Sequence, residues 1–236
     1  LIANLEGADL TGAQLQYADF SSSFMQGITL EHAQLQGANL RDADIDSAYM
    51  RRVQLQGADM TGANLIGADL REATVWMTLP PKSDQLRLTD LSALNVRAPN
   101  ATTREELMET VRSISDPQLR RNVRDSLTKL LTLKQSAAWQ TSNNAQIWRS
   151  LQTIERPGIV TAYAPELTAH LVKLACRSRW SNGAVADGIA RRALASRFQG
   201  NMTTLYASLA ENTACTGGRA LDKTMKLSLQ NAVETQ

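Results

Sequence analysis

Few residues of this chain have the types and spacing that catalysis needs. The two histidines are His32 and His170, and Glu166 precedes His170 by one helical turn. That pair could serve as an acid and a base or as two metal ligands, but no third group with suitable spacing accompanies it. We therefore expect His170 to form an ion pair or to lie at the edge of a core, and His32 to be solvated. The sequence predicts no catalytic residue, no metal site and no cofactor, so we expect a protein that is not an enzyme.

The chain has two cysteines, Cys176 and Cys215. One pair in a chain of 236 residues fits either a single disulfide or two buried thiols, and the cellular compartment would decide between them. No further cysteine or histidine has the spacing of a zinc site. Residue spacing alone therefore leaves both states of the cysteines open.

Basic side chains gather after residue 170, where Arg177, Arg179, Arg191 and Arg192 could form an interaction surface. Nucleic acid or an anionic lipid could bind there, with Trp180 between the arginines. More often such a cluster is a solvated helix face or a face docked against acidic residues. Acidic residues are available, since the first 76 residues carry a net charge of −6 and the rest of the chain carries +8. We therefore do not expect nucleic acid to be the partner.

A repeat of five residues organises the first third of the chain. Its central residue is apolar in every copy, and the residue two places earlier is small. The small residue is alanine in twelve of fifteen copies, the exceptions being Ser23, Ile28 and Val53. A period of five fits neither a helix nor a strand, so it indicates a repeat architecture whose interior is lined by these two positions. The central residues are Leu5, Leu10, Leu15, Phe20, Met25, Leu30, Leu35, Leu40, Ile45, Met50, Leu55, Met60, Leu65, Leu70 and Val75.

A second period of twenty residues lies within the first. The sequence AQLQ at residues 13–16 returns at 33–36 and, as VQLQ, at 53–56. Four repeats would thus form one turn, and residues twenty apart would stack at roughly the 4.8 Å spacing of neighbouring strands. The sequence predicts a four-sided solenoid of a little under four coils, roughly 20 Å long.

These residues resemble the pentapeptide repeat family, whose pattern A(D/N)LXX stands here as ADLTG at residues 8–12 and ANLIG at 63–67. The resemblance covers residues 3–76 and implies a β-solenoid, specifically a right-handed quadrilateral β-helix. The pattern departs most at residues 23–28, where Phe24 takes an outward position. We expect a distorted coil there, with an exposed aromatic that could belong to an interaction surface.

The outward positions suggest two roles for the solenoid surface. Glutamines twenty residues apart should align, and amide ladders of this kind stabilise stacked strands. Aspartates could instead make an acidic, DNA-like surface, because some members of the family resemble DNA in shape and charge and act on DNA gyrase. Arginines interrupt that surface, and the solenoid is shorter than such mimics would need. The aspartates are Asp9, Asp19, Asp44, Asp59 and Asp69, and the arginines are Arg41, Arg51, Arg52 and Arg71.

Three segments follow from these patterns. Residues 1–76 should form the pentapeptide repeat β-helix. Pro80 and Pro81 prevent another regular coil, so residues 77–101 should be a capping segment and linker. From residue 102 to 236 apolar residues recur at helical spacing, and Asp116 with Pro117 marks a helix start. This pattern predicts an all-α helical domain of seven short amphipathic helices.

The second half is also similar to the C-terminal region of large bacterial membrane-associated pentapeptide repeat proteins of unknown role, in segments 171–176 and 188–194 and at Cys215. That resemblance implies that Cys176 and Cys215 form a structural disulfide. It fits a fragment of a longer protein, since the first two residues are the end of a repeat whose beginning is missing. We expect a cytoplasmic or membrane-associated protein, or a periplasmic one if the cysteines are bonded. Any membrane contact would be made by a segment missing from this fragment.

Two functions of different class follow. The first is a non-enzymatic interaction or scaffold module of a bacterial pentapeptide repeat protein, which presents a rigid solenoid and a helical domain to an unidentified protein partner. The alternative is a DNA-mimic regulator of DNA gyrase or topoisomerase. A homo-oligomer formed through the solenoid end is a further expectation, because a bare solenoid end exposes its interior.

Overall fold

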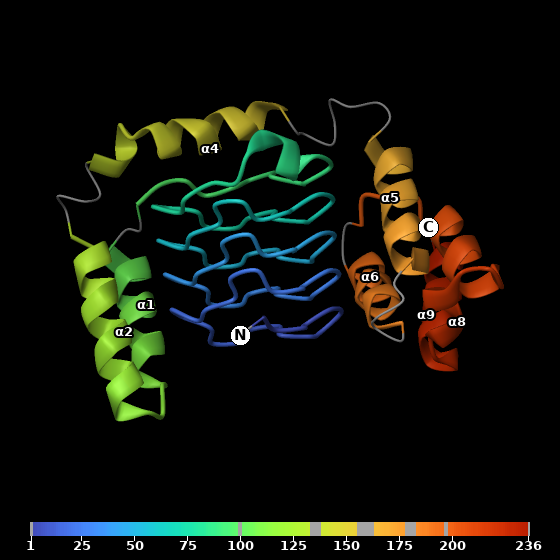
Figure 1. The fold of residues 1–236 in the computed structure, drawn as a ribbon, viewed down its shortest axis with the longest axis horizontal. Helices are drawn as coiled ribbons and strands as arrows, with labels where there is room; N and C mark the ends of the chain where they lie inside the picture. Colours follow the sequence, from blue (N-terminus) through green and yellow to red (C-terminus); the bar gives the residue numbers. More distant parts are fainter. Residues whose placement is uncertain are drawn as a thin grey trace.

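The computed structural model describes residues 2–98, 101–132, 138–154, 163–177, 183–195 and 198–235. A stack of coils stands in the middle, helices flank it on two opposite sides, and one helix lies across one end (Figure 1). The N-terminus lies in the coil at the other end of the stack. The chain therefore forms the coils one after another, and the helices that follow lie along the sides of the stack and across its end.

The coils pair through parallel bridges between residues twenty apart. Twelve such bridges join the four side positions of one coil to those of the next, as in the pair Asn4 and Phe24. At that bridge the N–H of Phe24 donates to the carbonyl of Ala3, and the N–H of Leu5 donates to the carbonyl of Phe24. Each side is one bridge long because the chain turns at the corner of every repeat, and φ is positive at the corner residues from Gly7 to Met77, between 55° and 78°.

The solenoid does not stop at the proline pair. Bridges continue with a spacing of twenty-one residues, from Asp69 to Asp90 and from Thr74 to Asn95. The extra residue is accommodated near the 3-10 turn η1 (Ser83–Leu86), which follows the prolines. The expected capping segment therefore adds a further, partial coil to the stack.

The interior of the stack is a continuous apolar core. The inward side chains of the second to fourth coils are fully buried, from Met25 to Val75. Alanine fills most of the alternate inward positions because the backbone closes tightly around the core there, and Ser23, Ile28 and Val53 are buried at the other three. Near the last coil, the hydroxyls of Thr78 and Thr89 each donate to a solenoid carbonyl at 2.6 Å.

Helices make up most of the described chain after residue 101. Asp116 accepts a hydrogen bond from the N–H of Leu119 and Pro117 follows at the first helical position, which confirms the predicted start. No helix within the described ranges is long and apolar enough to cross a membrane. The elements are α1 (Ala101–Arg112), α2 (Pro117–Leu130), α4 (Asn143–Ile154), α5 (Tyr163–Arg177), α6 (Ala184–Leu194), α7 (Met202–Tyr206), the π-helical turn η2 (Ala207–Glu211), α8 (Thr216–Ala220) and α9 (Lys223–Glu234).

These helices do not share one core. Helices α1 and α2 pack around Val123 and Leu127, and α5 to α9 surround a second core. The α4 side chains Trp148 and Leu151 instead join the core of the solenoid. Figure 1 shows the two groups on opposite sides of the coils and α4 across the end. The helical part predicted as one unit is therefore divided over three places, because its helices bury apolar faces against the solenoid as well as against one another.

The expected fold is confirmed in part. The helical part after residue 101 is present, and the coils pair at the predicted spacing of twenty residues. The described part of the repeat holds isolated bridges and no extended strand. The right-handed quadrilateral β-helix therefore stays a prediction at that level of detail.

Candidate interaction surface

Helix α6 lies along one corner of the solenoid, where glycines leave room for it. A Cβ on Gly7 would lie 1.8 Å from the carbonyl oxygen of Ala184, and a Cβ on Gly188 would lie 1.9 Å from that of Gly27. Backbone therefore meets backbone, and a side chain at these positions would separate the two surfaces. The corner residues of the four successive coils are Gly7, Gly27, Ser47 and Gly67.

Two arginines of α6 close this contact. Arg192 is 4% exposed, and its guanidinium donates to the carbonyls of Gly67 and Ser47. Arg191 pairs with Asp187 on α6 and donates to the carbonyl of Gly7. The two arginines named in the possible interaction surface thus lie in the docked arrangement that the sequence also allowed, although their acceptors on the solenoid are backbone carbonyls rather than acidic side chains. They face the solenoid because its corner carbonyls take no part in coil-to-coil hydrogen bonding and accept charge-assisted bonds instead.

Helix α5 adds two polar contacts to the same side of the solenoid. Nε2 of His170 lies 2.7 Å from Oδ1 of Asp46, and the hydroxyl of Tyr163 donates to the carbonyl of Leu88 at 3.0 Å. The histidine is thus paired with a carboxylate, as expected for a core-edge histidine. This carboxylate is on the solenoid, and it is not Glu166 of the same helix, because α5 turns this face toward the solenoid.

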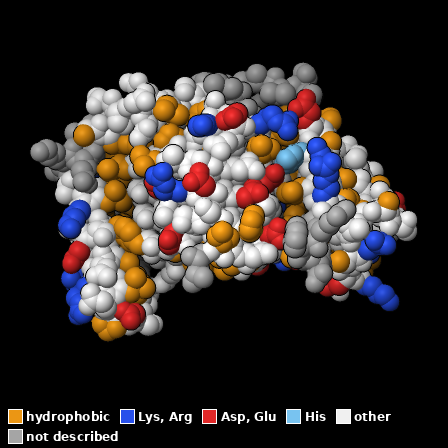
Figure 2. All heavy atoms as spheres, viewed as in Figure 1, with side chains coloured by type: hydrophobic (Ala, Val, Ile, Leu, Met, Phe, Trp, Pro, Cys, Tyr) orange, Lys and Arg blue, Asp and Glu red, His pale blue; other side chains and the backbone are white. Residues whose placement is uncertain are grey.

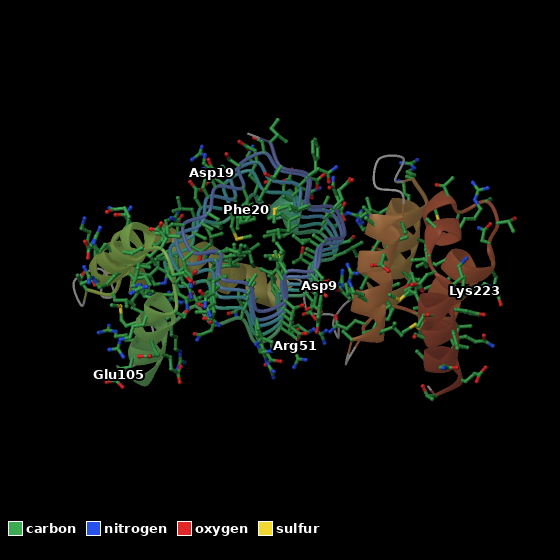
Figure 3. All side chains as sticks on the ribbon, turned by 90° about the horizontal axis from the view of Figure 1, so that it is seen from below. Asp9, Asp19, Phe20, Arg51, Glu105 and Lys223 are labelled. Carbon is green, nitrogen blue, oxygen red and sulfur yellow. A yellow bond between two sulfur atoms is a disulfide. The ribbon has the colours of Figure 1, made fainter. Side chains whose placement is uncertain are left out.

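The opposite corner receives α2 in a similar way. The ring of Tyr17 covers Gly37, and Leu130 of α2 covers Gly57 in the next coil. Nε2 of Gln14 donates to the hydroxyl of Ser113 at 2.6 Å, which ties the loop between α1 and α2 to the first coil. Figure 3, seen from below, shows the helices on two opposite sides of the ring of coils. Two of the four corners are therefore occupied by helices.

Helix α4 covers the last coil. The indole N–H of Trp148 donates to the carbonyl of Thr78 at 2.9 Å, and Nε2 of Gln152 donates to the carbonyl of Leu94 at 2.7 Å. Trp148 is fully buried, so it fills the end of the apolar interior. This end of the solenoid is closed by the chain itself.

The uncovered faces of the solenoid carry paired charges. Glu72 accepts hydrogen bonds from Arg51 and Arg52, both at 2.7 Å, and these bonds lower the pKa of its carboxyl to about 2. Asp59 pairs with Arg41 at 3.1 Å. Figure 2 shows acidic and basic side chains intermixed over the middle of the molecule rather than a surface of one sign. This arrangement differs from the uniform acidic surface that a DNA-like role would use.

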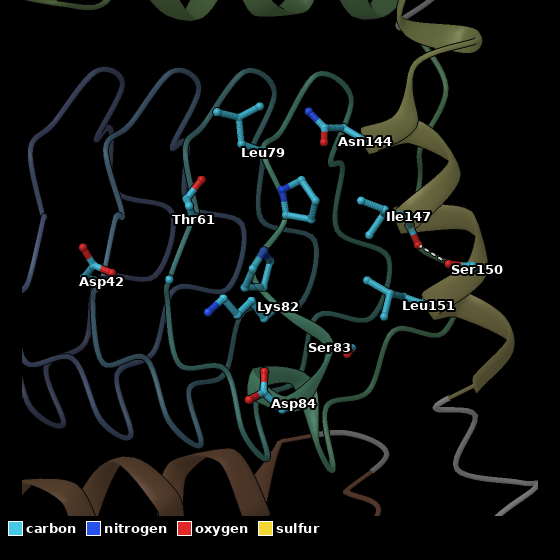
Figure 4. Close-up of a pocket in the computed structure, with 13 residues that line it drawn as sticks. Asp42, Thr61, Leu79, Lys82, Ser83, Asp84, Asn144, Ile147, Ser150 and Leu151 are labelled. Atoms are coloured by element: carbon cyan, nitrogen blue, oxygen red, sulfur yellow. Dashed lines mark hydrogen bonds between the residues drawn. The ribbon is translucent and has the colours of Figure 1, made fainter.

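An open hollow lies between the solenoid and α4. Its volume is about 950 Å³. Leu79, Pro80, Pro81, Ile147 and Leu151 give it an apolar side, and Leu79 is 38% exposed. Carboxylates and polar groups line its rim (Figure 4), namely Asp42, Thr61, Lys82, Ser83, Asp84, Asn144 and Ser150.

Sequence reasoning missed this hollow, although one signal was present. Leu79 continues the outward column of Asp19, Asn39 and Asp59 with an apolar side chain. An apolar residue in a polar column, next to two prolines, indicates contact with something other than water.

Two of the remaining predicted surface residues are exposed in the part of the chain that the structure describes. Phe24 is 47% exposed, as expected, and borders a hollow of about 530 Å³ with Asn4, Glu6 and Gln26. Arg177 is exposed at the end of α5. Arg179 lies outside the described residues. Of the four predicted interaction residues that the structure describes, Arg191 and Arg192 face the solenoid, whereas Phe24 and Arg177 are exposed.

Cys176 and Cys215 are joined by a disulfide in the structure. It links the last turn of α5 to the residue before α8, and the hydroxyl of Thr216 donates to the carbonyl of Cys176 at 2.8 Å. The bond therefore fastens the group of helices that holds α6 against the solenoid. Across the described residues, no cluster of three or more His, Cys, Asp or Glu side chains could hold a metal ion.

Comparison with known proteins identifies the repeat. Pentapeptide repeats match in eight copies over residues 3–27, 25–62 and 48–77. No curated protein matches the chain.

Solved structures of pentapeptide repeat proteins are similar over part of the chain. One from the Arabidopsis thaliana thylakoid lumen is 24% identical, covers 45% of this chain and 75% of its own, and has a TM-score of 0.34. Rfr23 of the cyanobacterium Cyanothece 51142 is 34% identical over 37% of this chain and 58% of its own, with a TM-score of 0.26. QnrB1, a plasmid-mediated fluoroquinolone resistance protein, is 19% identical over 42% and 62%, with a TM-score of 0.29. The chain thus spans less than two thirds of the latter two, and its residues 3–77 are pentapeptide repeats.

Proposed function

We propose that the protein is a non-enzymatic interaction module whose partner binds the hollow between the solenoid and α4. Pentapeptide repeats suggest a protein-interaction role, and the hollow is where this chain combines an exposed apolar surface with a polar rim. Such a combination is typical of surfaces that bind protein segments. The exposed side chain of Leu79, which lines the hollow together with Ile147, is the observation that carries the proposal.

Both walls of the hollow are held in place by contacts within the chain. One wall is the last full coil, fixed by bridges to the coil beneath, and the other is a helix anchored by the indole of Trp148. A preformed site of this kind loses little conformational entropy when a partner binds. The carboxylates of Asp42 and Asp84 outnumber the ammonium of Lys82 on the rim, so the partner segment should be apolar with a basic residue.

The DNA-mimic alternative has less support. Asp59 is paired with an arginine, and Asp69 accepts a hydrogen bond from Arg71 at 2.9 Å. The helices also occupy two corners, so a continuous surface the width of a duplex is not left on those sides. The role of the repeat in this proposal is to set geometry, as a right-handed quadrilateral β-helix with domain boundaries near residues 76 and 101.

A photo-reactive residue placed on the rim tests the proposal in cells. Substituting Ser83 or Ser150 with a photo-reactive amino acid puts the probe at the hollow, whereas Ser228 on α9, which does not line the hollow, gives a control. We expect a defined protein adduct from the first two positions and none from Ser228. The adduct should disappear when Leu79→Lys is added and persist when the exposed Leu227 of α9 is changed to Lys.

If the adduct disappeared with both Leu79→Lys and Leu227→Lys, the result would show that binding does not use the hollow. Adducts of equal yield from all three probe positions would contradict the proposal as well. Thermal unfolding of each variant checks that the protein is folded.

A further inference from the structure

Each side of a coil presents two backbone groups to the coil that follows it in the stack. On either side of Asp59, the carbonyl of Ala58 accepts a hydrogen bond from the N–H of Leu79. The N–H of Met60 in turn donates to the carbonyl of Leu79. A strand added next to a coil would use the same pair of groups, one carbonyl and one N–H.

The corresponding pair on the wall of the hollow does not suit a strand. The residue before Leu79 is Thr78, whose carbonyl already accepts a hydrogen bond from the indole N–H of Trp148 at 2.9 Å. The residue after Leu79 is Pro80, which has no N–H to donate. The coil therefore ends at Leu79 in an edge whose carbonyl is in use and whose donor is missing.

Helix α4 turns one face to the closed end of the stack and another to the hollow. Trp148 and Gln152, four residues apart, donate to carbonyls of the solenoid. Asn144, Ile147 and Leu151 line the hollow, and their spacing of three and four residues places them on a common face. One side of the hollow is therefore the face of a helix, which extends for about 10 Å from Asn144 to Leu151.

The other side of the hollow is a short apolar shelf formed by Leu79, Pro80 and Pro81. In Figure 4, Leu79 lies across from Asn144, and Asp84 lies at the opposite end of the shelf. The shelf thus runs beside α4 rather than away from it. A second helix could rest on this shelf and pack against α4, at the interaxial distance of about 8–10 Å that is usual for helix pairs.

The acidic residues lie at the margins of this space. Asp42 and Asp84 are both exposed. Figure 4 shows Asp42 on the side remote from α4 and Asp84 near one end of the shelf. An amphipathic helix carries apolar and charged residues on neighbouring faces, so it could place a basic side chain near Asp42 while its apolar face meets the shelf.

From these observations we infer that the partner enters the hollow as an amphipathic helix and not as an added strand. The helix is the binding segment of the partner in the proposed function, on which this inference rests. It lies along α4, with apolar residues at positions i, i+3 or i+4, and i+7 against Leu79, Pro80 and Ile147, and with a lysine or arginine toward Asp42. An extended segment would lack the backbone hydrogen bonds that give strand addition its affinity.

Random peptides of about fifteen residues, enough for about four helical turns, provide the probes. The library is displayed on phage and selected against the full chain. We expect the peptides that bind the unmodified protein but not Leu79→Lys to carry apolar residues at helical spacing, with a lysine or arginine on the flank. These peptides should bind Leu227→Lys, a variant at an exposed leucine of α9, as tightly as the unmodified protein.

Two measurements then distinguish a helix from a strand. A covalent bridge between residues i and i+4 on the polar face of a selected peptide fixes the helix before binding, so it should tighten binding at least about threefold relative to the unbridged peptide. Pro80→Ala returns an N–H to the edge, and a helical peptide should gain no affinity from it. Thermal unfolding of Pro80→Ala checks that the protein is folded, and the bridged peptide decides the question if it is not.

The outcomes separate this inference from the proposed function. Leu79-dependent peptides whose apolar residues alternate, whose binding is abolished by the bridge, or that bind Pro80→Ala more tightly would overturn the helix and leave the hollow as the binding site. An adduct through Ser83 that depends on Leu79, together with a library that yields no such peptide, would also overturn the helix alone. If neither the adduct nor any peptide depended on Leu79, the proposed function itself would fail.

Discussion

Two glycines of the first coil allow the docking of α6 to be measured against an internal control. Gly7 and Gly12 both have positive φ, 63° and 67°, at corners of the same coil. A Cβ on Gly7 would meet the backbone of α6 at 1.8 Å, whereas a Cβ on Gly12 would meet nothing within 4 Å. Alanine at either position therefore strains the backbone equally, and only Gly7→Ala also disturbs the helix.

The structure sets the expected magnitudes. A left-handed conformation costs an alanine about 1–2 kcal/mol relative to glycine, which applies to both variants. Overpacking against a rigid backbone adds about 1–3 kcal/mol for Gly7→Ala. If α6 moves away instead, the charge-assisted bond from Arg191 to the carbonyl of Gly7 is lost, at a cost of about 1.5–3 kcal/mol. Gly7→Ala should thus be less stable than Gly12→Ala by about 1–3 kcal/mol.

Urea unfolding followed by circular dichroism measures this difference. Hydrogen exchange in residues 184–194 should also be faster in Gly7→Ala than in Gly12→Ala, because the helix loses its support. Equal free energies of unfolding for the two variants, within about 0.5 kcal/mol, would refute the reasoning that α6 packs backbone to backbone on this corner.

Three further predictions concern single interactions. Reduction of the disulfide between Cys176 and Cys215, which are 39 residues apart, should lower the free energy of unfolding by about 4 kcal/mol, and equal urea midpoints with and without reductant would contradict this. The pKa of Glu72 is lowered from 4.5 to about 2 by its two arginines, so its stabilising contribution is complete above pH 4.5 and is lost as the pH falls toward 2. Glu72→Gln should therefore flatten the pH dependence of stability in that window, and a carboxyl titration near pH 4.5 by NMR would contradict the pairing. Trp148→Phe removes the donor to the buried carbonyl of Thr78 and should cost about 1–3 kcal/mol in urea unfolding, whereas an unchanged midpoint would show that the hydrogen bond is unimportant.

The repeat shows how much of the fold can be predicted from the sequence. Local periodicity carries that information, because each coil repeats the same inward and outward positions. The spacing of the segments at 13–16, 33–36 and 53–56 predicted the pairing of residues twenty apart, which the bridge between Gln14 and Gln34 confirms. The later shift to a spacing of twenty-one could not be predicted, since it depends on how the turn after Pro81 meets the coil beneath.

The placement of the helices shows why the rest could not be predicted. An amphipathic pattern states that a helix buries one face, but it does not say against what. The sequence could not decide between a free and a docked face for the arginines of α6, because their partners are backbone carbonyls, which leave no mark in the sequence. One signal was available: glycine recurs at twenty-residue spacing at the corners that receive α6 and α2, as in Gly7 with Gly27 and Gly37 with Gly57. Such a column indicates a close approach of another backbone or side chain.

The most direct test of the central claim is to identify the partner by cross-linking and then to measure its affinity for two leucine variants. Leu79→Lys changes the apolar wall of the hollow, and Leu227→Lys changes another exposed leucine, on α9. Burial of a leucine side chain contributes about 1.5–3 kcal/mol, so the first variant should bind the partner at least about tenfold more weakly than the unmodified protein. The second should bind with unchanged affinity. Unchanged affinity of Leu79→Lys would contradict the claim that the protein binds its partner in the hollow between the solenoid and α4.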